Sequence, residues 1–253
     1  MFGELLFEIG TEEIPSGYLA KGLEELKRLG ETYLRDQRIG IGEGLISLGT
    51  PRRLVLVGKA ISLRQEDVVQ EVTGPPKSAA FDKDGKPTKA ALGFAKKHGV
   101  TLEEVDIVET RRGEYLHLEK EIPGSPTIEI LTEILPRLVA DLPWPKSMRW
   151  GSYSFSFVRP IHWFLALFDG EVVPFEIAGI RSGNRTRGHR FMSSHEIEVT
   201  GVSDYLAKMR DNQVLVDPGE RQDAVERAVS EAAKQVSGVP SKDPELLETV
   251  ANP

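Results

Sequence analysis

The sequence predicts an α+β protein: a mixed, largely antiparallel sheet domain over residues 1–198, followed by a helical segment over residues 199–253. Strand-like runs are clustered along the first part and do not alternate strictly with helices, which argues against a doubly wound parallel fold. Asp169 and Gly170 separate two apolar runs, which is a strong hairpin signal. After about Thr200, apolar residues recur at helical spacing, and this change sets the predicted boundary.

The first 65 residues are expected to form a strand, a helix and two further strands. The run Glu4–Ile9 is typical of a buried strand. A helix is predicted next, because apolar residues with charges between them recur at helical spacing, at Leu19, Leu23, Leu26, Tyr33 and Leu34. The runs 44–49 and 53–61 are strand-like, and the tight segment 50–53 joins them.

The middle of the chain predicts a further strand, a hairpin and two helices. The run 67–76 ends in a Gly-Pro-Pro breaker, and a short basic helix is expected before Gly99. Strand-like runs on both sides of Arg111-Arg112-Gly113 indicate a hairpin. A helix is then expected with Ser125 as N-cap and Pro126 at its first position, kinked at Pro136.

The segment after residue 198 predicts two more helices. Asp217, Pro218 and Glu220 match an N-cap, a first-turn proline and a capping-box acid. A stripe of small apolar residues follows at helical spacing, from Ala224 to Val236. Asp243-Pro244 begins the last helix.

Composition narrows the class of protein. The chain has 253 residues, no cysteine and a formal net charge of −7. The absence of thiols excludes disulfides and fits a reducing compartment, so a cytoplasmic location is expected. The apolar runs are too short to span a bilayer, so no membrane association is expected. An acidic total still allows a local basic face, which phosphate binding requires.

No motif for a reaction centre is apparent. The sequence contains neither a P-loop nor a dinucleotide glycine pattern, and its five histidines lack zinc-binding spacing, so no cofactor, metal or catalytic residue is predicted. Glu12 and Glu13 follow the first strand and fit either an acidic site or a helix start favoured by the dipole. His162 lies in an apolar run and is expected to be buried and hydrogen-bonded.

Residues 146–190 concentrate positive charge among aromatic rings. The basic residues there are Lys146, Arg149, Arg159, Arg181, Arg185, Arg187 and Arg190, and the acids are Asp169, Glu171 and Glu176. Guanidinium groups bind phosphates bidentately, and aromatic rings stack on bases. The same composition fits core aromatics and arginines paired with surplus acids, and the sequence leaves both interpretations open. Arg52 and Arg53 open a strand, where charge also protects an edge strand.

Six short blocks together resemble one family. They occur in one order and at fitting intervals: Leu5–Pro15, Thr50–Leu56, 74–99, Lys146–Gly151, Phe157–Trp163 and Gly188–Phe191. Over nearly its whole length the chain is similar to the β subunit of the bacterial heterotetrameric glycyl-tRNA synthetase. The β chains of that family are longer, so the resemblance implies an N-terminal fragment.

The resemblance implies an α2β2 ligase of the class II type. Its α subunit uses ATP and Mg to make glycyl-adenylate, and its β subunit recognises tRNA(Gly). The N-terminal part of β resembles the editing-type domain of phenylalanyl-tRNA synthetase β chains. An HD-type domain and an anticodon-binding domain follow it in the family. The present chain has no His-Asp dipeptide, so both are expected to be missing from it.

Three functional hypotheses follow. The first is RNA handling through nine candidate tRNA-binding residues: Arg52, Arg53, Lys146, Arg149, Arg159, Arg185, Arg187, His189 and Arg190. The second is a structural module that holds α against β, which an exposed patch around Trp144 or Trp150 would favour. The third is editing-like hydrolysis of mischarged tRNA, with His162 or His189 orienting a water. RNA handling ranks first, because no constellation of residues indicates a reaction.

Overall fold

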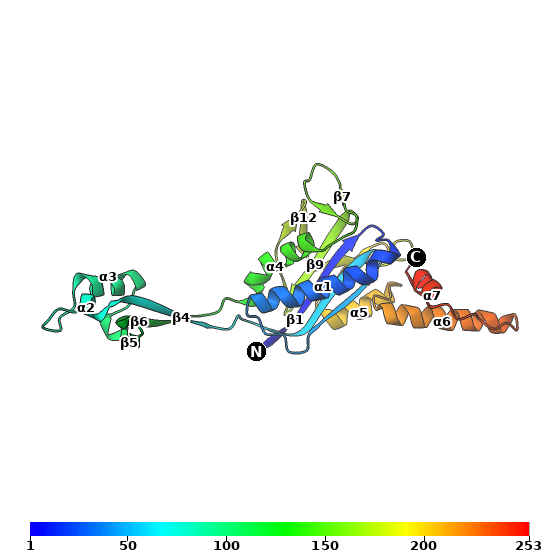
Figure 1. Ribbon diagram of the computed structural model, residues 1–253. Helices are drawn as coiled ribbons and strands as arrows, with labels where there is room; N and C mark the ends of the chain where they lie inside the picture. Colours follow the sequence, from blue (N-terminus) through cyan, green and yellow to red (C-terminus); the bar gives the residue numbers. More distant parts are fainter. Residues whose placement is uncertain (253) are drawn as a thin grey trace. The chain divides into compact units, whose positions relative to one another are not determined.

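The structure is a computed structural model that describes residues 1–252 (Figure 1). The chain divides into two compact units, one made of Met1–Gln65 with Ser125–Pro253 and the other of Glu66–Gly124. This division differs from the boundary at residue 198 that the sequence suggested. The separate unit is an internal insertion, and the residues after 198 are grouped with the first unit.

The first unit is built on a seven-stranded sheet. Its strands lie in the order β11 (Glu176–Ile177), β12 (Ile180–Gly183), β9 (Ile161–Phe168), β1 (Phe2–Thr11), β3 (Arg53–Ser62) and β2 (Leu45–Thr50), with β10 (Glu171–Val172) beside β9. Only β12 and β9 pair in parallel, and the other pairs are antiparallel. The predicted mixed, largely antiparallel sheet is confirmed. The predicted hairpin between β9 and β10 is also confirmed, and Asp169 and Gly170 adopt φ of 50° and 82° there.

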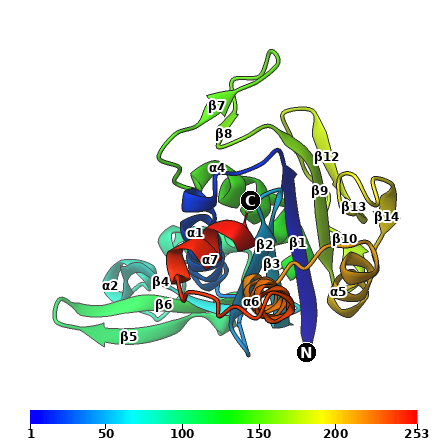
Figure 2. The ribbon, with the colours of Figure 1, turned by 90° about the vertical axis from the view of Figure 1, so that its right-hand side faces the viewer.

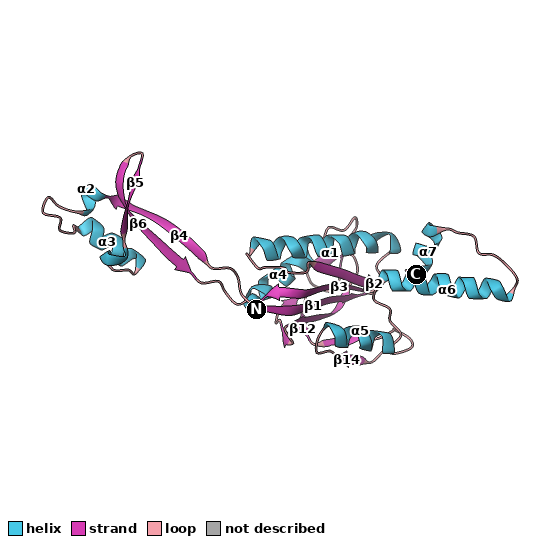
Figure 3. Ribbon diagram, turned by 90° about the horizontal axis from the view of Figure 1, so that it is seen from below, coloured by secondary structure: helices cyan, strands magenta, loops and turns pink. Residues whose placement is uncertain are grey.

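Two helices, α1 (Ser16–Asp36) and α4 (Thr127–Asp141), cover one face of this sheet (Figure 3). Side chains alternate along a strand, so β1 directs Leu5, Phe7 and Ile9 to the helices. The helical spacing predicted for α1 is confirmed. Pro126, and not Ser125, occupies the N-cap position of α4, and no side chain caps that helix. The predicted kink at Pro136 stays a prediction.

The opposite face of the sheet is covered by α5 (Val202–Asp211) and by the hairpin of β13 (Arg185–Arg187) and β14 (Glu196–Glu198). Leu6 of β1 and Tyr205 of α5 belong to this second core. Because β1 is buried on both faces, its segment Leu5–Ile9 consists of apolar residues except for the buried Glu8.

Two more helices, α6 (Pro218–Gln235) and α7 (Pro244–Ala251), complete the first unit (Figure 2). Asp217 caps α6 as predicted, and Asp243 caps α7, which begins where the sequence indicated; each accepts a hydrogen bond from a first-turn N–H. The apolar stripe of α6 does not form a core, since no residue of that helix is buried. No helix of the described chain has the length and apolar character needed to cross a bilayer.

The second unit is a three-stranded antiparallel sheet with short helices on one face. Its elements are β4 (Val68–Pro76), α2 (Lys77–Ala80), α3 (Lys89–His98), the 3-10 turn Leu102–Glu104, β5 (Asp106–Thr110) and β6 (Gly113–Ile122). The predicted hairpin around Gly113 and the short basic helix are both confirmed. Thr88 caps α3, and Gly99 ends it with φ of 70°.

Candidate nucleic-acid interface

Four segments that are far apart in the sequence meet at one end of the first unit's sheet. The backbone N–H of Thr11 donates to the carbonyl of Arg52 (2.9 Å), and that of Glu12 donates to the carbonyl of Pro160 (3.0 Å). The side chain of Arg190 reaches the Glu13 carboxylate, with 2.8 Å between Nη1 and Oε1. Four of the six sequence blocks therefore contribute to a single surface.

A buried polar network around Glu8 lies beneath this surface. The carboxylate of Glu8 is fully buried and accepts hydrogen bonds from Thr186 Oγ1, at 2.9 Å to each oxygen, and from Trp163 Nε1 at 2.9 Å. Arg53 Nη1 lies 3.5 Å from Glu8 Oε1, and Arg53 Nη2 donates to the carbonyl of Arg187 at 2.8 Å. A charge taken out of water needs such a partner.

Arg53 is consequently not a surface cation, since its side chain is 3% exposed. The strand that it opens, β3, lies between β1 and β2, so the edge-strand interpretation of Arg52 and Arg53 is wrong. The residues that follow Arg53 in β3 and the two neighbours of Glu8 in β1 are apolar and buried, so the Arg53–Glu8 pair lies in the core.

A close approach of two strands positions the indole of Trp163. Gly10 pairs with Trp163 across β1 and β9, and a Cβ atom on Gly10 would stand 2.0 Å from the indole ring. Only glycine leaves room for the ring at this position. The indole therefore lies over β1, where its N–H meets Glu8.

Tyr205 borders the same network from α5. Complete burial raises the pKa of Tyr205 well above its ordinary value, and the negative charge of Glu8 acts in the same direction. Its hydroxyl has no partner at hydrogen-bonding geometry within residues 1–252. Tyr205 is therefore a buried, protonated side chain whose hydroxyl lies beside the Glu8–Arg53 pair.

Glu12 and Glu13 form the centre of an outer cluster at the surface. His162 Nε2 lies 2.9 Å from Glu12 Oε1, and Arg190 and Arg52 each face both carboxylates at 2.8–3.8 Å. The interpretation of the two acids as a dipole-favoured helix start is wrong, because α1 begins only at Ser16 and has no acid in its first turn. His162 lies at the surface, so its predicted burial is also wrong.

The neighbours of Glu13 set its protonation. Partial burial by itself raises the pKa of Glu13, but a backbone hydrogen bond, the hydrogen bond from Arg190 and the charge of Arg52 outweigh it, so the pKa lies below its usual value. Arg159 is held nearby, since its Nε donates to the Glu13 carbonyl at 3.0 Å. The outer cluster thus holds the Glu13 carboxylate in its ionised form beside Arg52 and Arg190.

Arg185 and Arg187 lie on the exposed side of β13, beside a small hollow. The hollow has a volume of about 240 Å³, and its lining includes Trp163, Arg181, Arg185, Arg187 and Glu196. The Glu196 carboxylate is 3.3 Å from Arg185 Nη1 and 3.5 Å from Arg187 Nη2. Both predicted phosphate-binding arginines are therefore paired with one carboxylate.

Lys146 and Arg149 lie elsewhere. Arg149 belongs to a hairpin of β7 (Met148–Arg149) and β8 (Ser156–Phe157) that stands away from the sheet, and Lys146 lies just before β7 (Figure 2). Both side chains are exposed and have no hydrogen bond or ion pair within residues 1–252. No acid occurs between Asp141 and Asp169, so the hairpin has no acidic residue of its own.

The nine candidates therefore fall into separate groups. One group surrounds Glu12 and Glu13, a second faces Glu196, one member is buried against Glu8, and two lie on the hairpin. The ninth, His189, is half-buried, and its Nδ1 accepts the N–H groups of Phe191 and Met192 at 3.3 Å. Several arginines pair with acids, as one interpretation of the composition requires, and two of the candidate cations have no partner within residues 1–252. Phosphate binding stays a prediction.

The tryptophans do not form the exposed patch that an assembly module would favour. Trp144 packs edge-on against Phe157, with 5.3 Å between ring centroids, and lies over Gly22. Trp150 packs similarly against Phe155 at 5.8 Å. Both tryptophans extend the core beneath α1 and α4.

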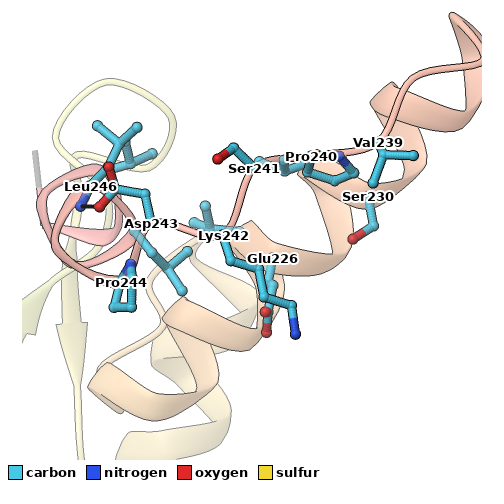
Figure 4. Close-up of a pocket in the computed structure, with 13 residues that line it drawn as sticks. Glu226, Ser230, Val239, Pro240, Ser241, Lys242, Asp243, Pro244 and Leu246 are labelled. Atoms are coloured by element: carbon cyan, nitrogen blue, oxygen red, sulfur yellow. Dashed lines mark hydrogen bonds between the residues drawn. The ribbon is translucent and has the colours of Figure 1, made fainter.

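Two further features were not found from the sequence. An apolar groove of about 470 Å³ lies between α6 and α7, with Val239, Pro240 and Leu246 among its lining residues (Figure 4). In the second unit, ligand atoms of Glu71, His117 and Glu119 lie within 4.8 Å of one another. Strand pairing brings Glu71 opposite Glu119, so no spacing along the chain indicates the group.

Fold and surface together define an α+β domain that gathers arginines, carboxylates and aromatic rings at one end of its sheet. Comparison with known proteins gives the family. Residues 5–252 match the family model described as glycyl-tRNA synthetase beta subunit, and the chain belongs to this family of aminoacyl-tRNA synthetase subunits. The resemblance inferred from the six sequence blocks is confirmed.

Several curated relatives carry the name glycine–tRNA ligase beta subunit. The chain is 46% identical to that of Syntrophus aciditrophicus over 250 residues, 99% of this chain, and 44% identical to that of Desulforudis audaxviator over 252 residues, 100% of this chain. The chain spans 36% of the length of each of these relatives.

Proposed function

We propose that this chain is the RNA-handling N-terminal part of a glycine–tRNA ligase β subunit and that it contacts the backbone of tRNA(Gly). The observation that carries this proposal is that Lys146 and Arg149, at the acid-free β7–β8 hairpin, are exposed and have no partner within residues 1–252. Family membership supports tRNA as the ligand, because the relatives are named as tRNA ligase subunits.

The rest of the enzyme is proposed from the same membership. In this proposal the α subunit is the partner in an α2β2 assembly, located in the cytoplasm, and holds the ATP, Mg and glycine site. The present chain then has no cofactor and no reaction centre of its own. Its contribution is to position tRNA for transfer.

The distribution of carboxylates favours the β7–β8 hairpin as the first point of contact with RNA. A phosphate that meets Lys146 or Arg149 has no protein carboxylate to displace. A phosphate that meets Arg190 competes with Glu12 and Glu13 for the guanidinium. Exposed ion pairs contribute only about 0–1 kcal/mol, so the paired arginines can still serve as secondary contacts.

The test is the double substitution Lys146→Glu/Arg149→Glu in the β subunit of the assembled enzyme. We expect the Kd for tRNA to rise roughly tenfold or more, and the slope of log K on log salt to fall by about 1–2. Lys21→Glu/Lys27→Glu on the exposed face of α1 makes the same charge change and is the matched control. If both double variants bind tRNA like the parent enzyme, the hairpin is not an RNA contact.

One observation favours assembly with α as a second candidate function. Phe191 and Met192 are 86% and 67% exposed, next to the outer cluster. Large exposed apolar side chains mark protein contacts. Phe191→Ser/Met192→Ser should then reduce co-purification of α with the β subunit, while tRNA binding by the remaining complex is unchanged.

The editing hypothesis rests on the likeness to the phenylalanyl-tRNA synthetase β domain. The only histidine–carboxylate contact among the candidate residues that the structure describes, His162–Glu12, lies at the surface beside Arg52. Incubation of the enzyme with mischarged tRNA tests this hypothesis, and release of amino acid at the background rate would rule it out.

A further inference from the structure

The hollow beside β13 has the composition of an anion site. Three guanidinium groups, from Arg181, Arg185 and Arg187, line its roughly 240 Å³ together with the indole of Trp163. Two carboxylates face these arginines. Glu176 pairs with Arg181 at 2.9 Å, and Glu196 contacts both Arg185 and Arg187. A third carboxylate, that of Glu198, borders the hollow through its hydrogen bond with Asn184, so three guanidinium groups and three carboxylates surround it.

The position of Glu196 is informative. Its two oxygens each face a different guanidinium, Oε2 that of Arg185 and Oε1 that of Arg187. A phosphate group can make the same pair of contacts, because its oxygens also accept from guanidinium forks. Arg185, Arg187 and Glu196 are all about half exposed, so the carboxylate can leave the pair by rotating into water.

We propose that this hollow binds one backbone phosphate of RNA between Arg185 and Arg187, and that Glu196 occupies the phosphate position until RNA displaces it. The inference deepens the proposed RNA-handling function and rests on it. It adds a defined contact, distinct from the β7–β8 hairpin, and assigns Glu196 as a carboxylate that competes with the ligand.

The inner network holds the two arginines in place for this contact. Thr186, between them in the sequence, is bound to the buried carboxylate of Glu8, and the carbonyl of Arg187 accepts from Arg53. Because Thr186 points into the core, strand alternation directs its two neighbours outward to the hollow. The guanidinium of Arg187 also lies 5.7 Å from the indole centroid of Trp163. A preorganised site of this kind loses little entropy on binding.

Exchange of carboxylate for phosphate is energetically accessible. Exposed ion pairs of the Arg185–Glu196 kind are weak, and their strength falls further with salt. A backbone phosphodiester carries one negative charge shared by its two non-bridging oxygens, like the carboxylate that it replaces. Its binding also releases counterions from the RNA, which favours the exchange at low salt.

The decisive variant is Glu196→Gln, measured for tRNA binding in the assembled enzyme. Removal of the competing charge should tighten tRNA binding by about two- to tenfold. Glu198→Gln is the matched control, because Glu198 lies on the same strand and bonds Asn184, and not Arg185 or Arg187. If Glu196→Gln binds tRNA no more tightly than Glu198→Gln, the displaced-carboxylate assignment is wrong.

Two further measurements complete the test. Arg185→Gln/Arg187→Gln should weaken binding and lower the salt slope by about 1. Inorganic phosphate should bind the Glu196→Gln enzyme and compete with tRNA, whereas phosphate binding without competition would overturn the assignment to RNA.

These variants distinguish a failure of the phosphate site beside β13 from a failure of the proposed RNA-handling function. If Lys146→Glu/Arg149→Glu weakens binding and the Glu196 and Arg185/Arg187 variants behave like the parent, RNA handling stands and this site is wrong. If none of these variants alters binding, both proposals fail.

Discussion

Thr186 and Glu8 are 178 residues apart in the sequence, yet the hydroxyl of Thr186 lies 2.9 Å from both oxygens of the buried Glu8 carboxylate. This contact holds β13, with its exposed arginines, against β1 of the main sheet. The surface that we propose to bind RNA is therefore supported by a charged group inside the core.

Glu8→Gln should destabilise the first unit strongly. The amide keeps the shape of the carboxylate but removes the charge that faces the buried Arg53, and an uncompensated buried charge costs about 3–5 kcal/mol. Urea unfolding monitored by circular dichroism measures the change. Arg181→Gln, which breaks an exposed pair with Glu176, should cost less than about 1 kcal/mol. Equal effects of the two variants would show that the buried pair has no special role.

Gly10→Ala should also be destabilising. The added methyl group would overlap the Trp163 ring, and overpacking of this kind costs about 1–3 kcal/mol. The same change at Gly17, which has open space around it in α1, should be neutral or stabilising by about 0.5–1 kcal/mol. The coupling can be checked with Trp163→Phe, since the smaller ring should reduce the cost of Gly10→Ala. Additive effects would contradict the contact.

Tyr205→Phe should be tolerated at neutral pH, because the tyrosine hydroxyl has no hydrogen-bond partner to lose within the described chain. The pKa of Tyr205 is raised by burial, so the folded state keeps its proton at a pH where the unfolded state, with a pKa of about 10, loses it. The stability due to this proton is complete below about pH 10 and decreases as the pH rises further.

Unfolding free energies of parent and Tyr205→Phe between neutral and alkaline pH test this expectation. The variant should lose less stability on the alkaline side. A loss above about 1 kcal/mol at neutral pH would mean that the hydroxyl has a partner.

Asp204→Asn should weaken α5 only when the carboxylate of the parent is ionised. The hydrogen bond from Lys208, reinforced by the N–H of Thr200, holds the pKa of Asp204 below its usual value. A lowered pKa contributes stability at neutral pH that is lost as the pH falls through the folded-state value.

The difference between the Asp204→Asn variant and the parent should be below about 1 kcal/mol at neutral pH and should vanish under acid conditions. Thermal unfolding at several pH values measures it. Asp223→Asn, at an exposed position of α6, is the control. A difference that persists in acid would point to packing and not to charge.

Local rules were sufficient for much of the fold. The spacing of Leu19, Leu23 and Leu26 predicted α1, the Asp169-Gly170 pair predicted the β9–β10 hairpin, and Asp217 predicted the start of α6. These features depend on neighbours within one or two turns, so a chain read in order contains the information. The blocks that identified the family are likewise local patterns.

Only the tertiary structure decided which charges meet. Arg52 and Arg53 are adjacent in the sequence, but Arg52 lies in the turn before β3 and meets Glu12 and Glu13 at the surface, whereas Arg53 opens β3 and meets Glu8 in the core. The burial of Arg53 depends on strand order, because β3 becomes interior only when β1 and β2 pair on its two sides. Such contacts join residues far apart in the chain.

Contacts between distant parts of the chain also decide which cations of the candidate site are paired with acids. The sequence determined that arginines and aromatic rings gather in residues 146–190, and left open whether they bind a ligand or pair with acids. The structure gave Arg185 and Arg187 a carboxylate from β14 and left Lys146 and Arg149 without one within the described chain. Composition fixes how many charges a segment has, whereas the packing of distant strands fixes which of them remain free to bind.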